Sequence, residues 1–488
     1  MPNFDSRNEQ TESPTALLVS YDRVHFSELL ETARVLKQSG KYRPVVCFVW
    51  DYPERACDVD VCERAEIACC NGAAQHLTSP ESTSALPPTQ PKGPAFQFAA
   101  SISRPIRHWL AACRRKSIFA EYVRYHRLIR KARLLLKRTN PVVAVLAGDH
   151  VEDISGPMIR AANERNIPVV VIPYTLCTSD EAAQYYYENP LYQVRGLRNK
   201  FAARRFPQWT YSFNGRKLLR LPAAGVLANE WLNLAPEEPW VPNSGKFDKL
   251  LTESQALTKY WKNAGIIPEK LVETGSPIID SLYAVTKNAV SLRAELNQRL
   301  KFTPGENRLL LCAFPFSAFP SRAEHCEFDT YDSLIKYWVQ SFAGLNNWHV
   351  VIRLHPRLRI ADFIKYETPN MRFCEDSTYS LVPLCDLFVA SASATIRWAI
   401  ACGRPTLNYD VYQFGYKDYE SATGVLTVSK KVEFERTLKR LACDGDFLRQ
   451  TTQSQVSCAP QWGKLDGKAG DRIIAALTEI VARRGVNQ

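Results

Sequence analysis

The sequence predicts an α/β protein of two domains, each built on a doubly wound parallel sheet. The chain is 488 residues long, and 45% of its residues are hydrophobic and 11% aromatic. That length and composition suit two or three compact domains and exclude a mostly disordered chain. Short apolar segments alternate with segments of helical period, which is typical of strands buried on both faces by helices. No run of about 18 apolar residues occurs, so no membrane-spanning helix is expected.

The first half opens with a strand, a helix and a second strand. The segments TALLVS at 15–20 and PVVCFVW at 44–50 are apolar, and 26–39 between them is helical in character. Such a unit implies parallel pairing through a right-handed crossover. Further strands are expected at 141–147 and 168–173, with helices at 117–138 and 155–165. Residues 77–103 are rich in Pro, Ser and Thr and indicate a flexible insertion, and we place the first domain at 14–245.

The alternation restarts near residue 249. Strands are expected at 249–252, 271–274, 308–313, 348–354, 386–390, 406–409 and 425–428, and helices at 255–264, from 278, and at 329–342, 396–402, 432–441 and 470–484. The mostly polar run 293–307 is interpreted as a connection. We therefore place a second domain at 246–465 and a C-terminal helix within 466–488.

The net charge is concentrated in the first half. It is +12, from 62 Lys and Arg minus 50 Asp and Glu. Residues 104–138 hold 12 Lys and Arg and one acid, and residues 195–220 hold 8 and no acid, which together make +19. The rest of the chain therefore carries −7 (12 minus 19), which argues against a generally basic nucleic-acid binder.

Both basic segments are interleaved with aromatic residues, a composition that fits an anionic membrane surface or an acceptor at that surface and that also fits nucleic acid. In the helix predicted at 117–138, the apolar residues fall within one arc and most basic residues lie on the other side. The alternative is an ordinary solvated helix face. The residues expected to form this membrane or acceptor surface are Arg124, Arg127, Lys131, Arg204, Arg205 and Arg216.

The 14 cysteines are scattered and form no Cys-x-x-Cys pair. The polar start of the chain does not resemble a secretory signal. We therefore expect reduced thiols and a cytoplasmic protein, associated peripherally with the inner face of a membrane. Cys57, Cys62, Cys69 and Cys70 lie close together, but their spacing fits no common zinc pattern, and no metal site is expected.

Three predicted strand ends in the second half carry groups suited to phosphate binding, and ligands of open α/β sheets bind beyond the carboxyl ends of strands. Gly275-Ser276-Pro277 precedes a helix, whose N-terminus attracts anions. Arg353-Leu354-His355-Pro356 ends a strand with a histidine that can donate to a phosphate or ribose. The segment from Ser391 to Thr395 offers three hydroxyls and backbone N–H groups. Taken singly, each feature also fits a helix cap or a locally satisfied histidine.

The order of these motifs resembles the C-terminal half of the GT-B-fold glycosyltransferases over about 249–416. The shared pattern is strand-Thr-Gly-Ser-Pro-helix, strand-His-Pro, and Asp-Leu-strand-Ser-Ala-Ser-helix-Gly-Arg-Pro. The nearer look-alikes are bacterial surface-polysaccharide enzymes, namely capsule Kdo and sialic acid transferases, CDP-glycerol glycerophosphotransferases and the UDP-GlcNAc 2-epimerase scaffold. The resemblance implies two Rossmann-like domains facing a cleft, with an N-terminal acceptor domain and a C-terminal nucleotide-donor domain.

Carried over by position, the resemblance implies roles for individual residues. His355 would contact the nucleotide phosphate. Ser276 and Arg353 would be supporting groups, and Asp410 sits where an acid could bind ribose or fix a loop; the alternative is a solvated turn acid. The hydroxyls implied to bind phosphate are Ser391, Ser393 and Thr395.

A base that deprotonates the acceptor is expected at the end of the strand 141–147, where four titratable residues cluster: Asp149, His150, Glu152 and Asp153. We favour Asp149 or His150, and the alternative is that these are loop and cap residues. The resemblance to glycerophosphotransferases calls for a second motif histidine, for which His25 and His150 are the candidates. The chain departs from the epimerases, because Ile172-Pro173-Tyr174-Thr175 stands where their His-Val-Glu-Ala-Gly signature should follow the strand.

These observations predict a glycosyltransferase that moves a sugar or polyol phosphate from a CMP-, CDP- or UDP-linked donor to a surface polysaccharide or lipid-linked acceptor. The nucleotide-activated donor is the substrate, and no cofactor is expected. The alternatives are a UDP-sugar epimerase-like enzyme and a non-catalytic module that binds nucleotide or glycan.

Overall fold

The structure is a computed structural model. It describes residues 13–486 except 22, 51, 53–54, 72–116, 173–177, 304, 306, 316–325 and 356–357. The expected insertion at 77–103 and the first part of the first basic segment lie outside the described residues. The chain divides into two compact units. Unit 1 comprises the residues up to 251, 260–272 and 473 onward, and unit 2 comprises 252–259 and 273–472.

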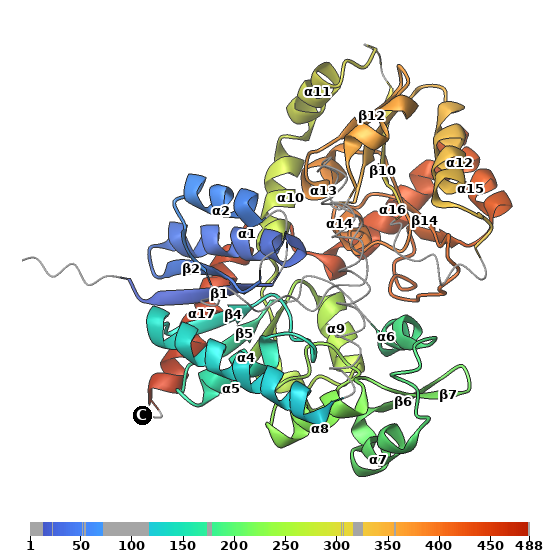
Figure 1. Cartoon of the computed structure of the whole chain (residues 1–488). Coiled ribbons are helices and arrows are strands. Elements are labelled where there is room, and N and C mark those ends of the chain that lie inside the picture. Colours follow the sequence, from blue (N-terminus) through green and yellow to red (C-terminus); the bar gives the residue numbers. More distant parts are fainter. Residues whose placement is uncertain are drawn as a thin grey trace, which may run out of the picture. The chain divides into compact units, whose positions relative to one another are not determined.

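Unit 1 is built on a seven-stranded sheet in the order β3-β2-β1-β4-β5-β8-β9 (Figure 1). The pairings from β3 to β8 are parallel. The chain fills the sheet outward from β1 to β3 and then places β4 on the other side of β1, which creates a switch point where ligands bind in such folds. The strands are β1 (Thr15–Ser20), β2 (Arg43–Phe48), β3 (Ala68–Asn71), β4 (Val143–Leu146), β5 (Val169–Val171), β8 (Lys249–Thr252) and β9 (Leu271–Glu273).

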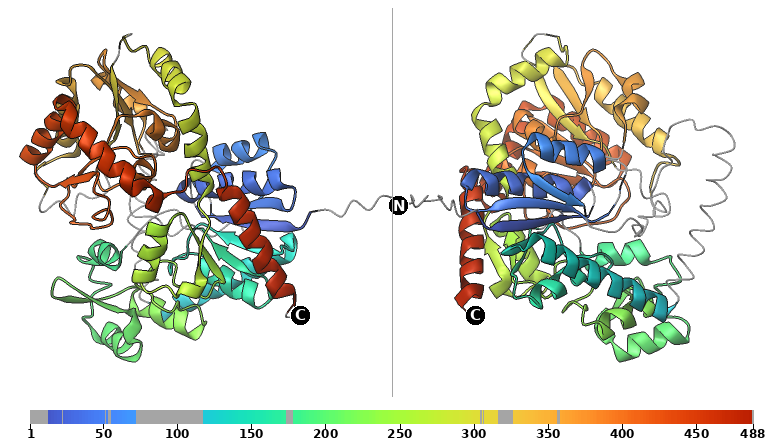
Figure 2. Two further views of the ribbon diagram at one scale, coloured as in Figure 1. Left: turned by 180° about the vertical axis from the view of Figure 1, so that it is seen from behind. Right: turned by 60° about the vertical axis from the view of Figure 1, so that its left-hand side comes forward.

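The central strands of this sheet are buried on both faces. Leu17 and Val19 of β1 pack into one core, whereas Ala16 and Leu18 pack into the other, because successive side chains of a strand point to opposite faces. The first core contains residues of the helices α4 (Ile118–Thr139), α5 (Ser155–Asn163) and α8 (Ala223–Trp231). The second contains residues of α1 (Arg23–Ser39) and of α17 (Ala469–Val486), which Figure 2 shows in red along the sheet.

Unit 2 has a six-stranded parallel sheet in the order β12-β11-β10-β13-β14-β15. Its switch point lies between β10 and β13. One face packs against α12 (Tyr331–Ala343) and α15 (Lys431–Cys443), where Trp338 and Phe434 join strand residues in a single core. The strands are β10 (Arg308–Ala313), β11 (Trp348–Arg353), β12 (Met371–Cys374), β13 (Leu387–Ala390), β14 (Thr406–Tyr409) and β15 (Val425–Val428).

The remaining elements connect the strands. Unit 1 also contains an antiparallel hairpin of β6 and β7, which no strand of the main sheet joins among the described residues. The bounds of these elements are α2 (Arg55–Arg64), α6 (Ser179–Tyr186), α7 (Leu197–Arg205), β6 (Thr210–Phe213), β7 (Arg216–Leu219), α9 (Gln255–Asn263), α10 (Pro277–Lys287), α11 (Ala289–Arg299), α13 (Thr378–Leu381), α14 (Ile396–Ala401) and α16 (Gly445–Trp462).

The predicted fold class, two Rossmann-like α/β domains, is confirmed by the two sheets. Several details differ from expectation. We placed 249–252 and 271–274 in the second domain, but β8 pairs with β5 and β9 with β8, so both extend the first sheet. Strand periodicity cannot reveal which sheet a short strand joins. The run 293–307, interpreted as a connection, contains most of helix α11, which buries little more than Leu296 and so lacks a clear apolar stripe.

Candidate functional site at the strand ends

The carboxyl ends of four strands in unit 2 are level with one another. Ala313 of β10 lies opposite both Arg353 of β11 and Ala390 of β13, and Ala390 lies opposite Asn408 of β14. Since neighbouring strands are about 4.8 Å apart, the segments that follow β11 and β13 leave the sheet about 10 Å from each other, on either side of β10. The fold therefore brings His355 and the 391–395 loop to one edge, at the switch point of the sheet.

The 391–395 loop is shaped by its own hydroxyls and by β14. The hydroxyls of Ser393 and Thr395 are 2.8 Å apart, and the Thr395 backbone N–H donates to Ser393 Oγ at 3.3 Å. Ala392 has a φ of 43°, in the left-handed region, and its N–H donates to Asn408 Oδ1 at 2.9 Å. The hydroxyls at 391, 393 and 395 are half-buried. The Ser393 and Thr395 hydroxyls lie close together, and the hydrogen bonds between these two residues stabilise the loop itself.

A buried ion pair that we did not predict lies beneath this loop. The guanidinium Nε of Arg397 donates to both carboxylate oxygens of Glu253, at 3.3 and 3.2 Å, and its Nη1 donates to the Ala394 carbonyl at 2.9 Å. Ser276 Oγ donates to Glu253 at 3.4 Å. Glu253, Arg397 and Ser276 are all buried and all belong to unit 2, so the ion pair fixes the 391–395 loop to the segments that carry Glu253 and Ser276. A carboxylate directly after a predicted strand was the sequence signal that could have indicated Glu253.

The other predicted donor residues are placed differently. Asp410 is buried, and its two carboxylate oxygens accept from the backbone N–H groups of Phe414 and Gly415, at 3.0 and 2.7 Å. Of its two suggested roles, this geometry fits loop fixing. Arg353 is half-buried and donates to the Leu354 carbonyl at 2.8 Å. His355 is half-buried, and its carbonyl accepts from the N–H of Leu358 at 2.8 Å.

In unit 1, the end of β4 carries the predicted cluster of titratable residues. Asp149 is buried and is held to the loop around Asn243: the Asp149 N–H donates to Asn243 Oδ1 at 2.7 Å, and the Asn243 N–H donates to the Asp149 carbonyl at 3.0 Å. A Cβ on Gly245 would lie 2.1 Å from Asp149 Oδ2, so only glycine fits there. Burial raises the pKa of Asp149 to about 6, although hydrogen bonds from Ser155 and Gly245 and the charge of Lys270 oppose this.

Ser155 connects the rest of this cluster. It is fully buried, its N–H donates to Asp153 Oδ1 at 2.7 Å, and its hydroxyl also donates to Asp153. The same hydroxyl accepts from the His150 N–H at 2.9 Å. Burial raises the pKa of Asp153 to about 7. The hydrogen bonds from Ser155 lower this pKa, whereas the negative charges of Asp149 and Glu152 raise it further. His150 is half-buried, so it is more accessible than Asp149.

Two of the predicted surface cations are not on the surface. Lys131 is buried: its Nζ donates to the Val49 carbonyl at 2.5 Å and lies 4.8 Å from the centre of the Trp50 ring. Arg124 is mostly buried and bonds Glu121 at 2.9 Å and the Glu152 carbonyl at 2.6 Å. Our expectation for these two was wrong, because long basic side chains on a helix flank can turn inward to reach carbonyls and carboxylates.

The remaining predicted surface cations do face solvent, to different degrees. Arg127, Arg204 and Arg205 are exposed. Arg216 is half-exposed, bonds Glu188 at 3.2 Å and lies 4.2 Å from the centre of the Tyr187 ring. Of the six predicted surface cations, three are therefore exposed, one is half-exposed and two are turned inward.

Arg124 and Glu152 line a cavity of about 20 Å³ with Glu121, Tyr125 and Tyr192. On its rim, Glu152 accepts from the Tyr186 hydroxyl at 2.8 Å. A space of this size holds about one water molecule. It is therefore too small for a sugar.

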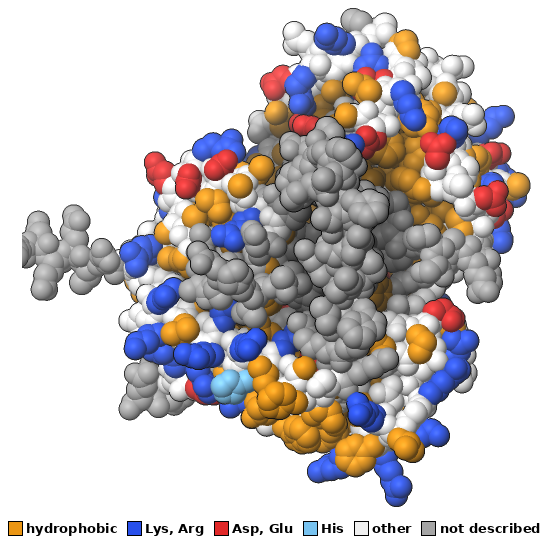
Figure 3. Space-filling model, in the orientation of Figure 1, with side chains coloured by type: hydrophobic (Ala, Val, Ile, Leu, Met, Phe, Trp, Pro, Cys, Tyr) orange, Lys and Arg blue, Asp and Glu red, His pale blue; other side chains and the backbone are white. Residues whose placement is uncertain are grey.

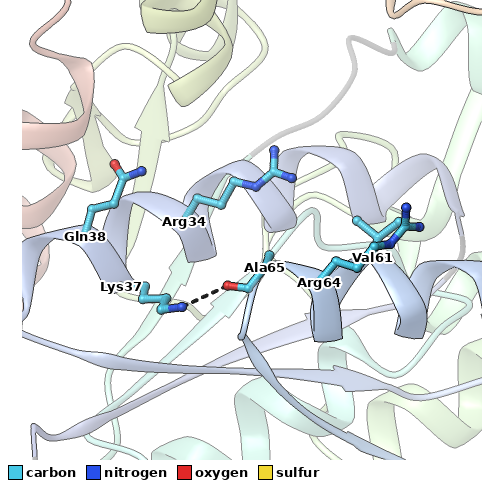
Figure 4. A pocket seen from close by; sticks show the side chains of 6 residues that line it. All are labelled: Arg34, Lys37, Gln38, Val61, Arg64 and Ala65. Carbon is cyan, nitrogen blue, oxygen red and sulfur yellow. Dashed lines mark hydrogen bonds between the residues drawn. The ribbon is translucent and has the colours of Figure 1, made fainter.

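A larger hollow of about 490 Å³ lies on α1 and α2 (Figure 4), lined by Arg34, Lys37, Gln38, Val61, Arg64 and Ala65. Lys37 bonds the Ala65 carbonyl and Glu66, and Arg34 pairs with Glu31 at 2.5 Å. Because these cations already have partners, we assign this hollow no ligand.

Among the residues that the structure describes, no group of three or more His, Cys, Asp or Glu side chains is arranged to hold a metal ion. Within the same residues, no helix is long and apolar enough to cross a membrane.

No protein-family model matches the chain, and no curated protein matches its sequence. Solved structures do match. The UDP-GlcNAc 2-epimerase from Neisseria meningitidis, bound to UDP-GlcNAc, has a TM-score of 0.54 and 14% identity over 95% of this chain and 100% of its own. The kitacinnamycin glycotransferase has a TM-score of 0.51 and 12% identity over 95% and 99%. The wall teichoic acid polymerase TagF has a TM-score of 0.51 and 10% identity over 96% and 90%.

At these low sequence identities, the structural similarity establishes the fold of this chain only. The chain has the GT-B type of architecture, with two Rossmann-like domains, and the resemblance inferred from its motifs is confirmed at that level.

Asp153→Asn should make stability less dependent on pH. The folded chain holds protons on Asp149 and Asp153 up to about pH 6 and about pH 7, whereas an unperturbed aspartate ionises near 3.8. The unfolded state therefore loses these protons first, so the contribution of the two carboxyls to stability falls as the pH rises from about 4 to 7. The melting temperature of Asp153→Asn, relative to wild type, should rise between about pH 5 and about pH 8.

Asp466→Asn is a control for this prediction. The Asp466 pKa is lowered by its hydrogen bond with Arg472, so its effect should be a constant offset over that range. A constant offset for Asp153→Asn as well would contradict the prediction.

Removing one partner of the Glu253–Arg397 pair should lower the free energy of unfolding more than replacing both partners by apolar residues. Glu253→Ala leaves a buried guanidinium without its carboxylate and should lower the free energy of unfolding by about 3–5 kcal/mol. The double variant Glu253→Leu/Arg397→Met should recover much of this, because it removes both buried charges. Denaturant unfolding followed by circular dichroism measures both. If the single and double variants lose the same free energy of unfolding, the unpaired buried charge is not the cause of the destabilisation.

Proposed function

We propose that the protein transfers a sugar or polyol phosphate from a nucleotide-activated donor to a surface polysaccharide or lipid-linked acceptor. The observation that carries the proposal is the level edge of unit 2. There His355 and the hydroxyls of Ser393 and Thr395 follow strands on either side of the switch point. That edge is where nucleotides bind in doubly wound folds. The UDP-GlcNAc bound to the neisserial epimerase supports a uridine nucleotide as the first donor to test.

On the donor side, the diphosphate would lie between His355 and the 391–395 loop. The imidazole can donate to a phosphate oxygen, and the Ser391, Ser393 and Thr395 hydroxyls can donate from the other side. Because the loop is held by Asn408 and by the Arg397 guanidinium, its donors are already oriented before the donor binds. Pre-oriented donors stabilise the charge that develops on the leaving nucleotide.

On the acceptor side, a base must take the proton of the attacking hydroxyl. His150 and Asp149 follow β4 at the switch point of unit 1. We favour His150, because it is more exposed than Asp149, whose carboxylate is enclosed by Gly245. Asp149 would then act as a positioning residue, because its carboxylate is hydrogen-bonded to Ser155 and to the Gly245 backbone and so holds the end of β4 against the loop that contains Gly245. The sequence left Asp149 and His150 as equal candidates for the base, and we now place His150 first.

Epimerisation remains the second candidate, since several of the structural neighbours are UDP-GlcNAc 2-epimerases. Incubating the protein with UDP-GlcNAc separates the two reactions. An epimerase converts the sugar and needs no acceptor, whereas a transferase requires one. The sequence 172–175 lacks the motif that the epimerases carry there, which favours the transferase.

A nucleotide should stabilise the wild-type protein, and His355→Ala should reduce that effect. Thermal-shift measurements with CMP, CDP, UDP and GDP identify the base, because a ligand that binds the folded state raises the melting temperature. Loss of a hydrogen bond to a charged phosphate should weaken binding about tenfold or more. His126→Ala, which removes an exposed histidine of α4, is the matched control and should bind as wild type. If His355→Ala binds every nucleotide like wild type, the donor site is misassigned.

His150→Ala should lower turnover about 10²- to 10⁴-fold and leave nucleotide binding intact, because a general base acts on the acceptor and not on the donor. For Asp149→Asn, tested in parallel, Asp58→Asn is the matched control: Asp58 is also a buried aspartate, but it lies on α2 and accepts from the Tyr52 hydroxyl. Turnover is followed by release of free nucleotide. A large loss in Asp149→Asn with normal turnover in His150→Ala would assign the base to Asp149 instead.

A further inference from the structure

Helix α7 presents two large apolar side chains to solvent. Leu197 is 88% exposed and Phe201 is 60% exposed. They are four residues apart and therefore lie on the same face of the helix, one turn from each other. Soluble proteins usually cover such neighbouring apolar groups. This face therefore needs an explanation.

Basic residues flank that apolar pair on both sides. With about 3.6 residues per turn, Arg198 and Arg205 fall on one flank, and Lys200 and Arg204 on the other. All four are exposed, and α7 contains no acidic residue. Among the described residues, no carboxylate forms an ion pair with Lys200, Arg204 or Arg205. Figure 3 shows hydrophobic side chains among Lys and Arg where Figure 1 labels α7.

The opposite face of α7 is firmly attached to unit 1. Ala202 and Ala203 are buried in a core with Trp209 and Leu221. The Asn199 amide donates to the carbonyls of Leu191 and Gln193, at 3.0 and 2.8 Å, and accepts from the Ala223 N–H at 3.2 Å. Its outward face is thus held rigidly in place.

We propose that α7 docks unit 1 onto the surface of an anionic phospholipid bilayer, with Leu197 and Phe201 inserted among the acyl chains. Arg198, Lys200, Arg204 and Arg205 would contact lipid phosphates around them. A helix with a basic rim and an apolar centre lies in the plane of such an interface. The inference rests on the proposed function in one respect: a lipid-linked acceptor would be located at the bilayer surface.

The apolar pair is what favours lipid over another polyanion. A nucleic acid would satisfy the four cations, but it offers no hydrocarbon for Leu197 and Phe201, which would stay in water. A bilayer satisfies both, because apolar burial and attraction to anionic headgroups act together.

The test is sedimentation with vesicles of phosphatidylcholine and phosphatidylglycerol at about three to one, and with phosphatidylcholine alone. Wild type should bind the anionic vesicles, and bind less at high salt.

Leu197→Ser/Phe201→Ser should weaken binding about tenfold or more. Arg204→Gln/Arg205→Gln should weaken it about fivefold per cation at low salt. The matched control is Val290→Ser/Val432→Ser in unit 2, which changes two side chains that are 88% and 73% exposed and should bind as wild type.

Three results would overturn the proposal. The first is that wild type does not bind anionic vesicles at low salt. The second is that Leu197→Ser/Phe201→Ser binds as well as wild type. The third is that the protein binds duplex DNA or RNA but not vesicles, and that this binding survives Leu197→Ser/Phe201→Ser, which would make the face a polyanion site.

The nucleotide thermal shift, measured on the same samples, separates the two proposals. If the shift is present but vesicle binding is absent, the docking inference fails and the donor site stands. If vesicle binding is present but no nucleotide shifts the melting temperature, the proposed function fails and docking stands. An unchanged shift in Leu197→Ser/Phe201→Ser shows that this variant is folded.

Discussion

Both units depend on one constraint: their central strands are buried on both faces. In β1, alternate residues enter two different cores, so neither face of the strand can carry functional polar side chains. Such side chains must therefore lie where the strands end. The strand order then decides which strand ends are neighbours, because in each sheet the chain adds strands first on one side and then on the other side of one switch point. The β4 cluster in unit 1 and the His355 and 391–395 segments in unit 2 are the local consequences of that single constraint.

Buried charge is the second theme of this molecule. Within unit 2, the Glu253–Arg397 ion pair holds the loop that we propose to bind phosphate. Asp149 and Lys131 are likewise buried and hydrogen-bonded to backbone groups. Replacing such groups by apolar ones is often tolerated energetically, so they are better explained by the positions they enforce than by the stability they add. In unit 2 the enforced position is that of the Ala394 carbonyl, in the middle of the 391–395 loop.

Several features could be predicted from the sequence because they depend on local pattern. The strands at 15–20, 308–313 and 406–409 were predicted at their observed bounds, since apolar runs between turn residues are a strong signal. Helix α11 was missed because it has hardly any buried face. The direction of Lys131 was also predicted incorrectly, since helical periodicity places a side chain on a face but cannot show that a long stem bends back to a carbonyl.

The sequence by itself determined the fold class and the residues at the strand ends, because apolar burial and turn chemistry act over a few neighbouring residues. Only the tertiary structure decided which sheet β8 joins, that Glu253 pairs with Arg397 across 144 positions, and that Leu197 and Phe201 remain exposed between cations. These depend on contacts between segments far apart in the chain. The same residue types could have been paired, buried or solvated in another packing, and no local pattern distinguishes those outcomes.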